Sequence, residues 1–118
     1  MVYEAGESLR FNKVAVSEGI NGCLRLLNDL DMIDEQVPSH NTVVLSQSSW
    51  VRAKVSGMFL TYKKYGKKVE KGEIIGVISE PFGEMEYPLF SPEEGYIIGI
   101  NNSPVVNQGD ALIHIGVH

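Results

Sequence analysis

Residues 12–31 repeat apolar side chains at steps of three and four, the spacing of one face of an α-helix. Asn12 stands where this helix would begin, and its short polar side chain is a favoured N-cap. Gly19 and Gly22 fall inside the pattern, and each costs about 1 kcal/mol relative to alanine, so we expect close packing against a neighbouring sheet or helix. The sequence predicts an amphipathic helix whose apolar stripe comprises Val16, Ile20, Cys23, Leu24, Leu27 and Leu30.

The pattern changes after this helix. Residues 34–41, DEQVPSHN, are polar and follow neither a helical nor a strand period, which is typical of a linker. Beyond them, short β-type runs separated by glycines follow one another, which favours a mainly β domain over alternating strands and helices. We therefore expect a first segment at 1–36 and a β domain at 37–118. The expected strands are 42–45, 50–55, 74–78, 96–100 and 111–115.

The β region contains an internal repeat. The segments SGMFL and VEKGEIIGVI are followed by EGYII and VNQGDALIHI, with the same residue classes in the same order. In each copy the second glycine suits a turn, and the acid after it can bond to nearby amides. Two such units related by a pseudo-twofold axis predict a flattened β-barrel, whereas two ordinary hairpins with glycine turns are the alternative. The matched positions are Gly57 and Gly95, Val69 and Val106, Gly72 and Gly109, Glu73 and Asp110, Ile75 and Leu112, and Ile78 and Ile115.

A duplicated barrel of this kind resembles the biotinyl/lipoyl carrier domain, a barrel-sandwich hybrid built from two pseudo-symmetric halves. The resemblance implies a modifiable lysine on the hairpin between the halves, here SEPFGEMEYPLF, eleven residues before Gly95. That position is Glu84, and no lysine follows Lys71. We therefore expect the fold of a carrier without its covalent arm. A covalent carrier would need modification of a lysine outside this hairpin.

The charge and cysteine counts limit the classes of partner and the cellular compartment that we expect for the chain. Its 118 residues carry 10 Lys plus Arg against 15 Asp plus Glu, a net charge of −5, which argues against binding driven by nucleic-acid phosphates. No apolar run reaches the ~18 residues of a membrane-spanning helix. Cys23 is the only cysteine, so no internal disulfide can form, and we interpret it as a small buried hydrophobe. We expect a soluble cytoplasmic protein with no nucleic-acid or membrane partner.

The charged and histidine residues contain no recognisable catalytic motif. Five lysines lie within residues 63–71, a composition that would suit a nucleic-acid patch, but the matching turn NNSPVVNQ of the second copy is neutral. A solvated loop facing acidic side chains is therefore favoured. His40, His114 and His118 lack the spacing of zinc ligands, so we expect no metal site in this chain. The acids that could face the lysines are Glu80, Glu84, Glu86, Glu93 and Glu94.

The order of YEAGESLRF, an amphipathic helix ending LRLLNDLDMI and a duplicated barrel resembles the C-terminal portion of the succinylglutamate desuccinylase/aspartoacylase family over residues 2–118. Members of that family are zinc-dependent hydrolases that cleave the amide bond of N-acyl amino acids. The resemblance implies that Glu4 is the glutamate of the family's Thr-x-Glu-x-Gly motif, which serves as general base and acid. Gly6 is then the motif glycine, and Val2 stands in the place of the threonine.

The same resemblance implies which parts of the enzyme lie elsewhere. The family's zinc ligands and substrate-binding arginines precede the matched stretch. We therefore hypothesise that residues 1–36 are the last strand and helix of a catalytic domain whose remainder holds zinc and the N-acyl amino acid. This chain alone would bind no cofactor and would be inactive. Its helix at 12–31 would dock on the β domain or form a homo-oligomer. The alternative is a non-catalytic biotinyl/lipoyl-like adaptor between proteins.

Overall fold

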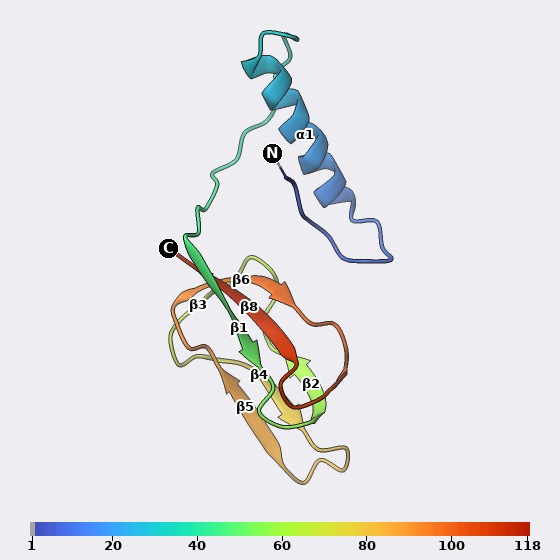
Figure 1. Ribbon diagram of the computed structural model, residues 1–118, viewed down its shortest axis with the longest axis vertical. Coiled ribbons are helices and arrows are strands. Elements are labelled where there is room, and N and C mark those ends of the chain that lie inside the picture. Colours follow the sequence, from blue (N-terminus) through green and yellow to red (C-terminus); the bar gives the residue numbers. More distant parts are fainter. Residues whose placement is uncertain (1) are drawn as a thin grey trace. The chain divides into compact units, whose positions relative to one another are not determined.

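The computed structural model describes residues 2–118 and divides the chain into two compact units, Met1–Thr42 and Val43–His118 (Figure 1). The sequence places the change of domain between residues 36 and 37. The residues between these two boundaries belong to the first unit because helix side chains hold them. Arg25 Nη1 donates a hydrogen bond of 2.6 Å to the carbonyl of Pro38, and His40 Nε2 lies 3.3 Å from Glu18 Oε1.

Helix α1 spans Lys13–Asp29 and confirms the predicted amphipathic helix. Asn12 is its N-cap, because its Oδ1 accepts hydrogen bonds of 3.0 and 3.2 Å from the amides of Val14 and Ala15. A cap of this kind contributes about 1 kcal/mol. At the other end, the side-chain amide of Asn28 exchanges two hydrogen bonds with the backbone of Glu35. The segment predicted as a linker is therefore tied to the end of the helix.

The strand predicted at the start of the chain is wrong. Residues 2–12 form neither strand nor helix. A strand is stabilised by hydrogen bonds to a second strand, and α1 is the only regular element in the described part of the first unit.

The second unit is mainly β, as predicted. In the described part of the chain, its strands form two four-stranded antiparallel sheets. Sheet A has the order β1-β8-β6-β3, and sheet B has the order β5-β4-β2-β7. The strands are β1 (Gln47–Arg52), β2 (Gly57–Thr61), β3 (Lys68–Val69), β4 (Ile74–Ser79), β5 (Glu86–Phe90), β6 (Gly95–Ile100), β7 (Val105–Val106) and β8 (Ala111–Val117).

The strand predicted at 42–45 is also wrong, although the other four predicted runs overlap β1, β4, β6 and β8. The first strand begins at Gln47, which pairs with Val117 at the end of β8. Residues 42–45 therefore have no partner strand to continue the ladder. Val44 O lies 2.9 Å from Nδ1 of His118, the residue after β8.

The topology repeats between the two halves of the unit. Exchanging β2 with β6, β3 with β7, β4 with β8 and β5 with β1 converts the order of sheet B into the order of sheet A. The register agrees, because Gly57 pairs with Val106 and Gly95 pairs with Val69. Two pseudo-symmetric halves require this arrangement. The sheets do not join into one closed barrel, so the barrel-sandwich hybrid stays a prediction.

The matched turns share their hydrogen bonds as well. Gly72 and Gly109 have φ angles of 81° and 94°, a region that favours glycine. The carboxylate of Glu73 accepts from the amide of Glu70 at 2.9 Å, and that of Asp110 accepts from the amide of Asn107 at 2.7 Å. The acid after each glycine therefore closes its turn, as the repeat predicts.

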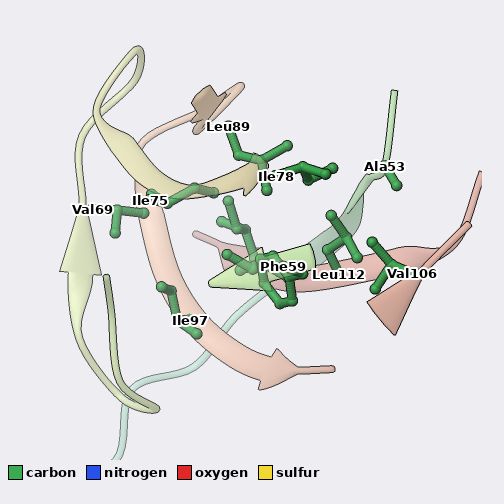
Figure 2. Close-up of a cluster of buried hydrophobic side chains, with 11 residues drawn as sticks. Ala53, Phe59, Val69, Ile75, Ile78, Leu89, Ile97, Val106 and Leu112 are labelled. Carbon is green, nitrogen blue, oxygen red and sulfur yellow. The ribbon is translucent and has the colours of Figure 1, made fainter. Parts of the chain in front are cut away.

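The core of the second unit lies between the two sheets (Figure 2). It includes most of the apolar positions that the repeat matches, and side chains from both sheets point into it. Full burial of each such side chain contributes about 1.5–3 kcal/mol, so this cluster is the main source of stability. Its members are Ala53, Phe59, Val69, Ile75, Ile78, Leu89, Ile97, Val106, Leu112, Ile113 and Ile115.

We predict that Gly57→Ala and Gly95→Ala each destabilise the second unit by about 3 kcal/mol. A Cβ at Gly57 would lie 2.5 Å from the carbonyl oxygen of Ser79, and one at Gly95 would lie 2.4 Å from that of Gly116, so backbone must shift. Urea unfolding followed by fluorescence of Trp50, the only tryptophan, measures the change. Gly66→Ala, with φ of 73° and open space around it, is the control and should cost about 1 kcal/mol. Equal losses at all three positions would contradict the prediction.

We also predict an acid-sensitive contribution from Glu73. The Lys63 ammonium first, and then the Glu70 amide, hold the pKa of this carboxyl below its ordinary value. Because the folded pKa is the lower one, the stabilisation is present above about pH 4.3 and is lost as the pH falls through the folded pKa. Glu73→Gln should therefore reduce the fall in the urea midpoint between about pH 5 and pH 3. Glu84→Gln should leave that fall unchanged, and identical profiles for wild type and Glu73→Gln would refute the expectation.

Candidate functional site

The predicted catalytic residue, Glu4, lies in an exposed segment that is held against α1 by its neighbour Tyr3. The Tyr3 hydroxyl donates a hydrogen bond of 2.7 Å to the carbonyl of Ala15. The Tyr3 ring covers Gly19, where a Cβ would come within 3.0 Å of ring atom Cε1. Gly19 is therefore closely packed, but its partner is an aromatic ring from a segment without regular structure and not the sheet or helix that the sequence predicts. At Gly22 the nearest atom is Arg25 Nη2 at 4.0 Å, so that glycine has no such contact.

An apolar groove of about 610 Å³ runs between this segment and the helix. Tyr3 and Ala5 line it on either side of Glu4, and the groove includes most of the predicted helical stripe. Cys23 lies in this groove and is exposed, so its interpretation as a buried residue is wrong. The lining residues are Tyr3, Ala5, Gly6, Arg10, Phe11, Asn12, Ala15, Val16, Gly19, Ile20, Cys23 and Leu24.

Glu4 itself does not line the groove. Within residues 2–118, no hydrogen bond or ion pair engages its carboxylate. Gly6 has a φ of 85°, in the region that favours glycine, and the chain turns there toward the helix. The site residue and the motif glycine therefore lie together on one short segment, with the carboxylate exposed.

The side chains of the described residues offer no zinc site, because no three His, Cys, Asp or Glu side chains come together among them. Each histidine has a different neighbour. His40 contacts Glu18, His114 stacks on Trp50 with ring centroids 4.4 Å apart, and the ring of His118 meets that of Tyr96 edge-on. The histidines of the described residues are therefore not gathered into one set of metal donors.

The lysine-rich loop pairs with one of the predicted acids and with one other. Lys68 Nζ lies 2.5 Å from Glu94 Oε1, which confirms one predicted partner. This hydrogen bond raises the pKa of Lys68 and lowers that of Glu94. Lys63 pairs instead with Glu73, which the sequence analysis assigned to a turn. The Lys68–Glu94 pair lies at the surface, where such interactions contribute little, whereas the side chains of Lys63 and Glu73 are only 24% and 34% exposed.

The hairpin tip between the two halves follows β4 and precedes β5. Its turn is closed by hydrogen bonds from Gly83 N to Glu80 O at 2.9 Å and from Glu80 N to Met85 O at 3.1 Å. Glu84, the position of a carrier's lysine by resemblance, lies exposed in this turn.

Among the described residues, no helix is long and apolar enough to cross a membrane.

No protein-family model and no curated protein matches the sequence. Solved structures do match. The chain aligns with the ectoine utilization protein EutE (DoeB) from Ruegeria pomeroyi, with 17% identity, a TM-score of 0.78, and coverage of 92% of this chain and 35% of that one. A succinylglutamate desuccinylase/aspartoacylase from Rhodobacter sphaeroides gives 20% identity, a TM-score of 0.75, and coverage of 91% and 37%. A protein of the same family from Shewanella amazonensis gives 22% identity and a TM-score of 0.80, with coverage of 96% of this chain and 33% of that one.

The chain has the fold of the C-terminal part of these proteins. The resemblance stated from the residues is thus confirmed at the level of the fold. The chain spans about a third of the length of the structures it matches. A single-chain, multi-domain long-chain acyl-CoA carboxylase also matches, with 19% identity, a TM-score of 0.55, and coverage of 66% of this chain and 8% of that one.

Sequence reasoning missed the contact between Tyr3 and Gly19. The signal was present, because Gly19 falls on the apolar stripe and the only aromatic residue of the opening segment before Phe11 is Tyr3. Periodicity ranks positions on a helix but does not say which distant side chain covers them. The contact fixes the segment that carries Glu4, so it belongs to the candidate site.

We predict that Tyr3→Phe destabilises the first unit by about 1 kcal/mol through loss of its hydrogen bond, and that Tyr3→Ala has a larger effect because the ring over Gly19 is lost as well. Far-UV circular dichroism at 222 nm reports α1, since the second unit is built of strands. Tyr62→Ala in the second unit is the control and should leave the helical signal unchanged. Equal helix melting of wild type and Tyr3→Ala would show that the contact does not form in solution.

Proposed function

We propose that this chain is the C-terminal part of an amide hydrolase of the succinylglutamate desuccinylase/aspartoacylase type, acting on N-acyl amino acids. The observation that supports the proposal is the extent of the structural match. The second unit makes up about two thirds of the chain, yet the match covers 91–96% of the whole chain. The match therefore includes most of the first unit. A free-standing β domain has no need of that unit.

In this proposal Glu4 moves protons during cleavage of the amide bond. Its carboxylate would accept a proton from the attacking water and deliver it to the leaving amine, as general base and then general acid. Its exposed position, with Tyr3 anchoring the segment beside it, leaves the carboxylate open to a substrate bound by another part of the protein. The described residues do not fit zinc, so any metal and its ligands would belong to that other part.

The partner in this proposal is the remainder of a catalytic domain, and the surface that would meet it is the apolar groove of the first unit. Tyr3 and Ala5 line the groove on both sides of Glu4, so a domain seated there would reach the carboxylate. Burial of the exposed side chains of Val16 and Ile20, both more than half exposed, would favour the contact. A cytoplasmic location, predicted from the single cysteine, is part of the same proposal.

A second candidate function is a non-catalytic adaptor. The observation that favours it is the match to the acyl-CoA carboxylase, whose coverage of 66% is about the size of the second unit alone. With Glu84 at the hairpin tip, such a domain would bind partners without a covalent arm. The two candidates differ in the first unit, which only the hydrolase requires.

We predict that residues 2–118, fused behind the N-terminal two thirds of the Rhodobacter sphaeroides relative, restore hydrolysis of N-acyl amino acids, whereas the chain alone has no activity. Glu4→Gln in the fusion should lower the rate by about 10²–10⁴-fold, because a proton-transferring group is lost. Release of the free amine from N-acetyl and N-succinyl amino acids measures the rate.

Glu35→Gln, in the same unit but outside the groove, is the matched control and should keep the activity of the fusion. Size-exclusion chromatography and circular dichroism establish that each fusion is folded before the rates are compared. A folded, metal-loaded fusion that is inactive would count against the hydrolase, and so would one whose activity survives Glu4→Gln.

A further inference from the structure

The outer face of sheet B is apolar where an antiparallel sheet facing water is normally polar. Side chains alternate along its strands, so Phe59 and Leu89 point into the core while their neighbours point outward. Val77 is only 7% exposed but lies outside the core cluster, since its outward neighbours cover it. We call this surface the sheet B face. It comprises Met58, Leu60, Val77, Pro88, Phe90 and Val105, which lie beside one another in the register of β5, β4, β2 and β7.

Four side chains of the sheet B face are highly exposed. Met58, Leu60, Phe90 and Val105 are 47%, 59%, 49% and 66% exposed. Single exposed apolar residues are ordinary, whereas a contiguous apolar surface marks an interaction site. The sheet B face is contiguous across all four strands, because Val105 pairs with Met58, and Leu60 and Pro88 both pair with Val77.

The pseudo-symmetry of the unit supplies an internal comparison. At five of these six register positions, sheet A carries polar, charged or amphipathic side chains. At the sixth, that of Leu60, the bulge in β6 places Gly99 opposite His114, and the adjacent Ile98 is apolar and 44% exposed. The fold therefore does not require apolar residues at these places, and their presence on one sheet needs another explanation. The matched pairs, sheet B residue first, are Met58 and Tyr96, Val77 and His114, Pro88 and Trp50, Phe90 and Arg52, and Val105 and Lys68.

The two ends of the sheet B face carry opposite charge. At one end β4 finishes at Ser79, which pairs with Glu86, and the turn beyond holds Glu80 and Glu84. Because β2 runs antiparallel to β4, its last residue lies at the opposite end, where the chain continues into Lys63 and Lys64. Lys71 precedes β4 at that same end. Of the acids there, Glu73 is paired with Lys63, whereas Glu70 precedes Lys71 and Glu93 follows β5. Lys54, three residues before β2, lies toward the Glu86 end. The face thus has an excess of acids at one end, an apolar centre and an excess of lysines at the other.

We propose that the sheet B face is a dimer interface that binds the same face of a second copy of this chain. A surface that is acidic at one end and basic at the other is complementary to itself after a twofold rotation that reverses the strand direction. In that arrangement the apolar centres pack together as two stacked sheets, and the Glu86 end of each copy meets the Lys64 end of the other. A partner of uniform charge would match only one end. The proposal is independent of the proposed hydrolase, because it uses no residue of the first unit.

The test is sedimentation velocity of the full chain over a range of concentrations, with wild type compared with Leu60→Glu. We expect a concentration-dependent dimer for wild type and about a 100-fold weaker dimer for Leu60→Glu, which would bury two unpaired carboxylates. Ile98→Glu on the outer face of sheet A, where Ile98 is 44% exposed, is the matched control and should dimerise like wild type. Trp50 fluorescence and circular dichroism confirm that each variant is folded.

Charge reversal distinguishes a second copy from any other occupant. Glu86→Lys and Lys64→Glu should each weaken the dimer by about tenfold at low salt, and the double variant should recover most of that loss because the pairs re-form with exchanged signs. A monomeric wild-type chain at all concentrations would overturn the proposal. It would also be overturned by a dimer that survives Leu60→Glu and dissociates on Ile20→Glu, since that result would assign the contact to the helix groove.

Discussion

The close approach of two strands to the backbone of their neighbours at Gly57 and Gly95 is the constraint on which the second unit depends. Each glycine lies where a Cβ would meet a carbonyl oxygen of the adjoining strand, Ser79 in one half and Gly116 in the other. Because the chain can pass there, β2 can pair with both β4 and β7, and β6 with both β8 and β3. The two sheets and the core between them follow from these paired contacts.

The two halves of the second unit share one core but present different outer surfaces. The inward positions of the repeat are alike and build one core, because both halves face the same interior. Most outward positions have diverged, with mainly polar and aromatic residues on sheet A, Ile98 apart, and apolar residues on sheet B. Core packing restricts the residues at the inward positions, whereas the residues at the outward positions can change to suit a binding partner. The differences between the two outer faces therefore carry more functional information than their shared core.

The first unit follows a different principle, because its helix has an apolar face but no core of its own. No residue of α1 is buried, and its fold depends on local contacts: the Asn12 cap, the Tyr3 ring over Gly19 and the polar bonds to residues 35–40. Such contacts are individually worth about 1 kcal/mol, so the unit is expected to gain much of its stability from a partner surface. This dependence agrees with the proposal that the groove beside Glu4 receives another part of an enzyme.

The sequence by itself determined the amphipathic helix with its cap at Asn12, the mainly β character of the rest and the matched glycine turns, because periodicity, capping and turn chemistry are local. The motif around Glu4 and Gly6 also pointed to the family whose fold the chain has. Only the tertiary structure decided that the segment before the helix and residues 42–45 are not strands and that Cys23 is exposed. Strand formation and burial depend on which distant segment lies opposite, and the pairing of Leu60 with Val77 on an outward face is likewise a matter of register.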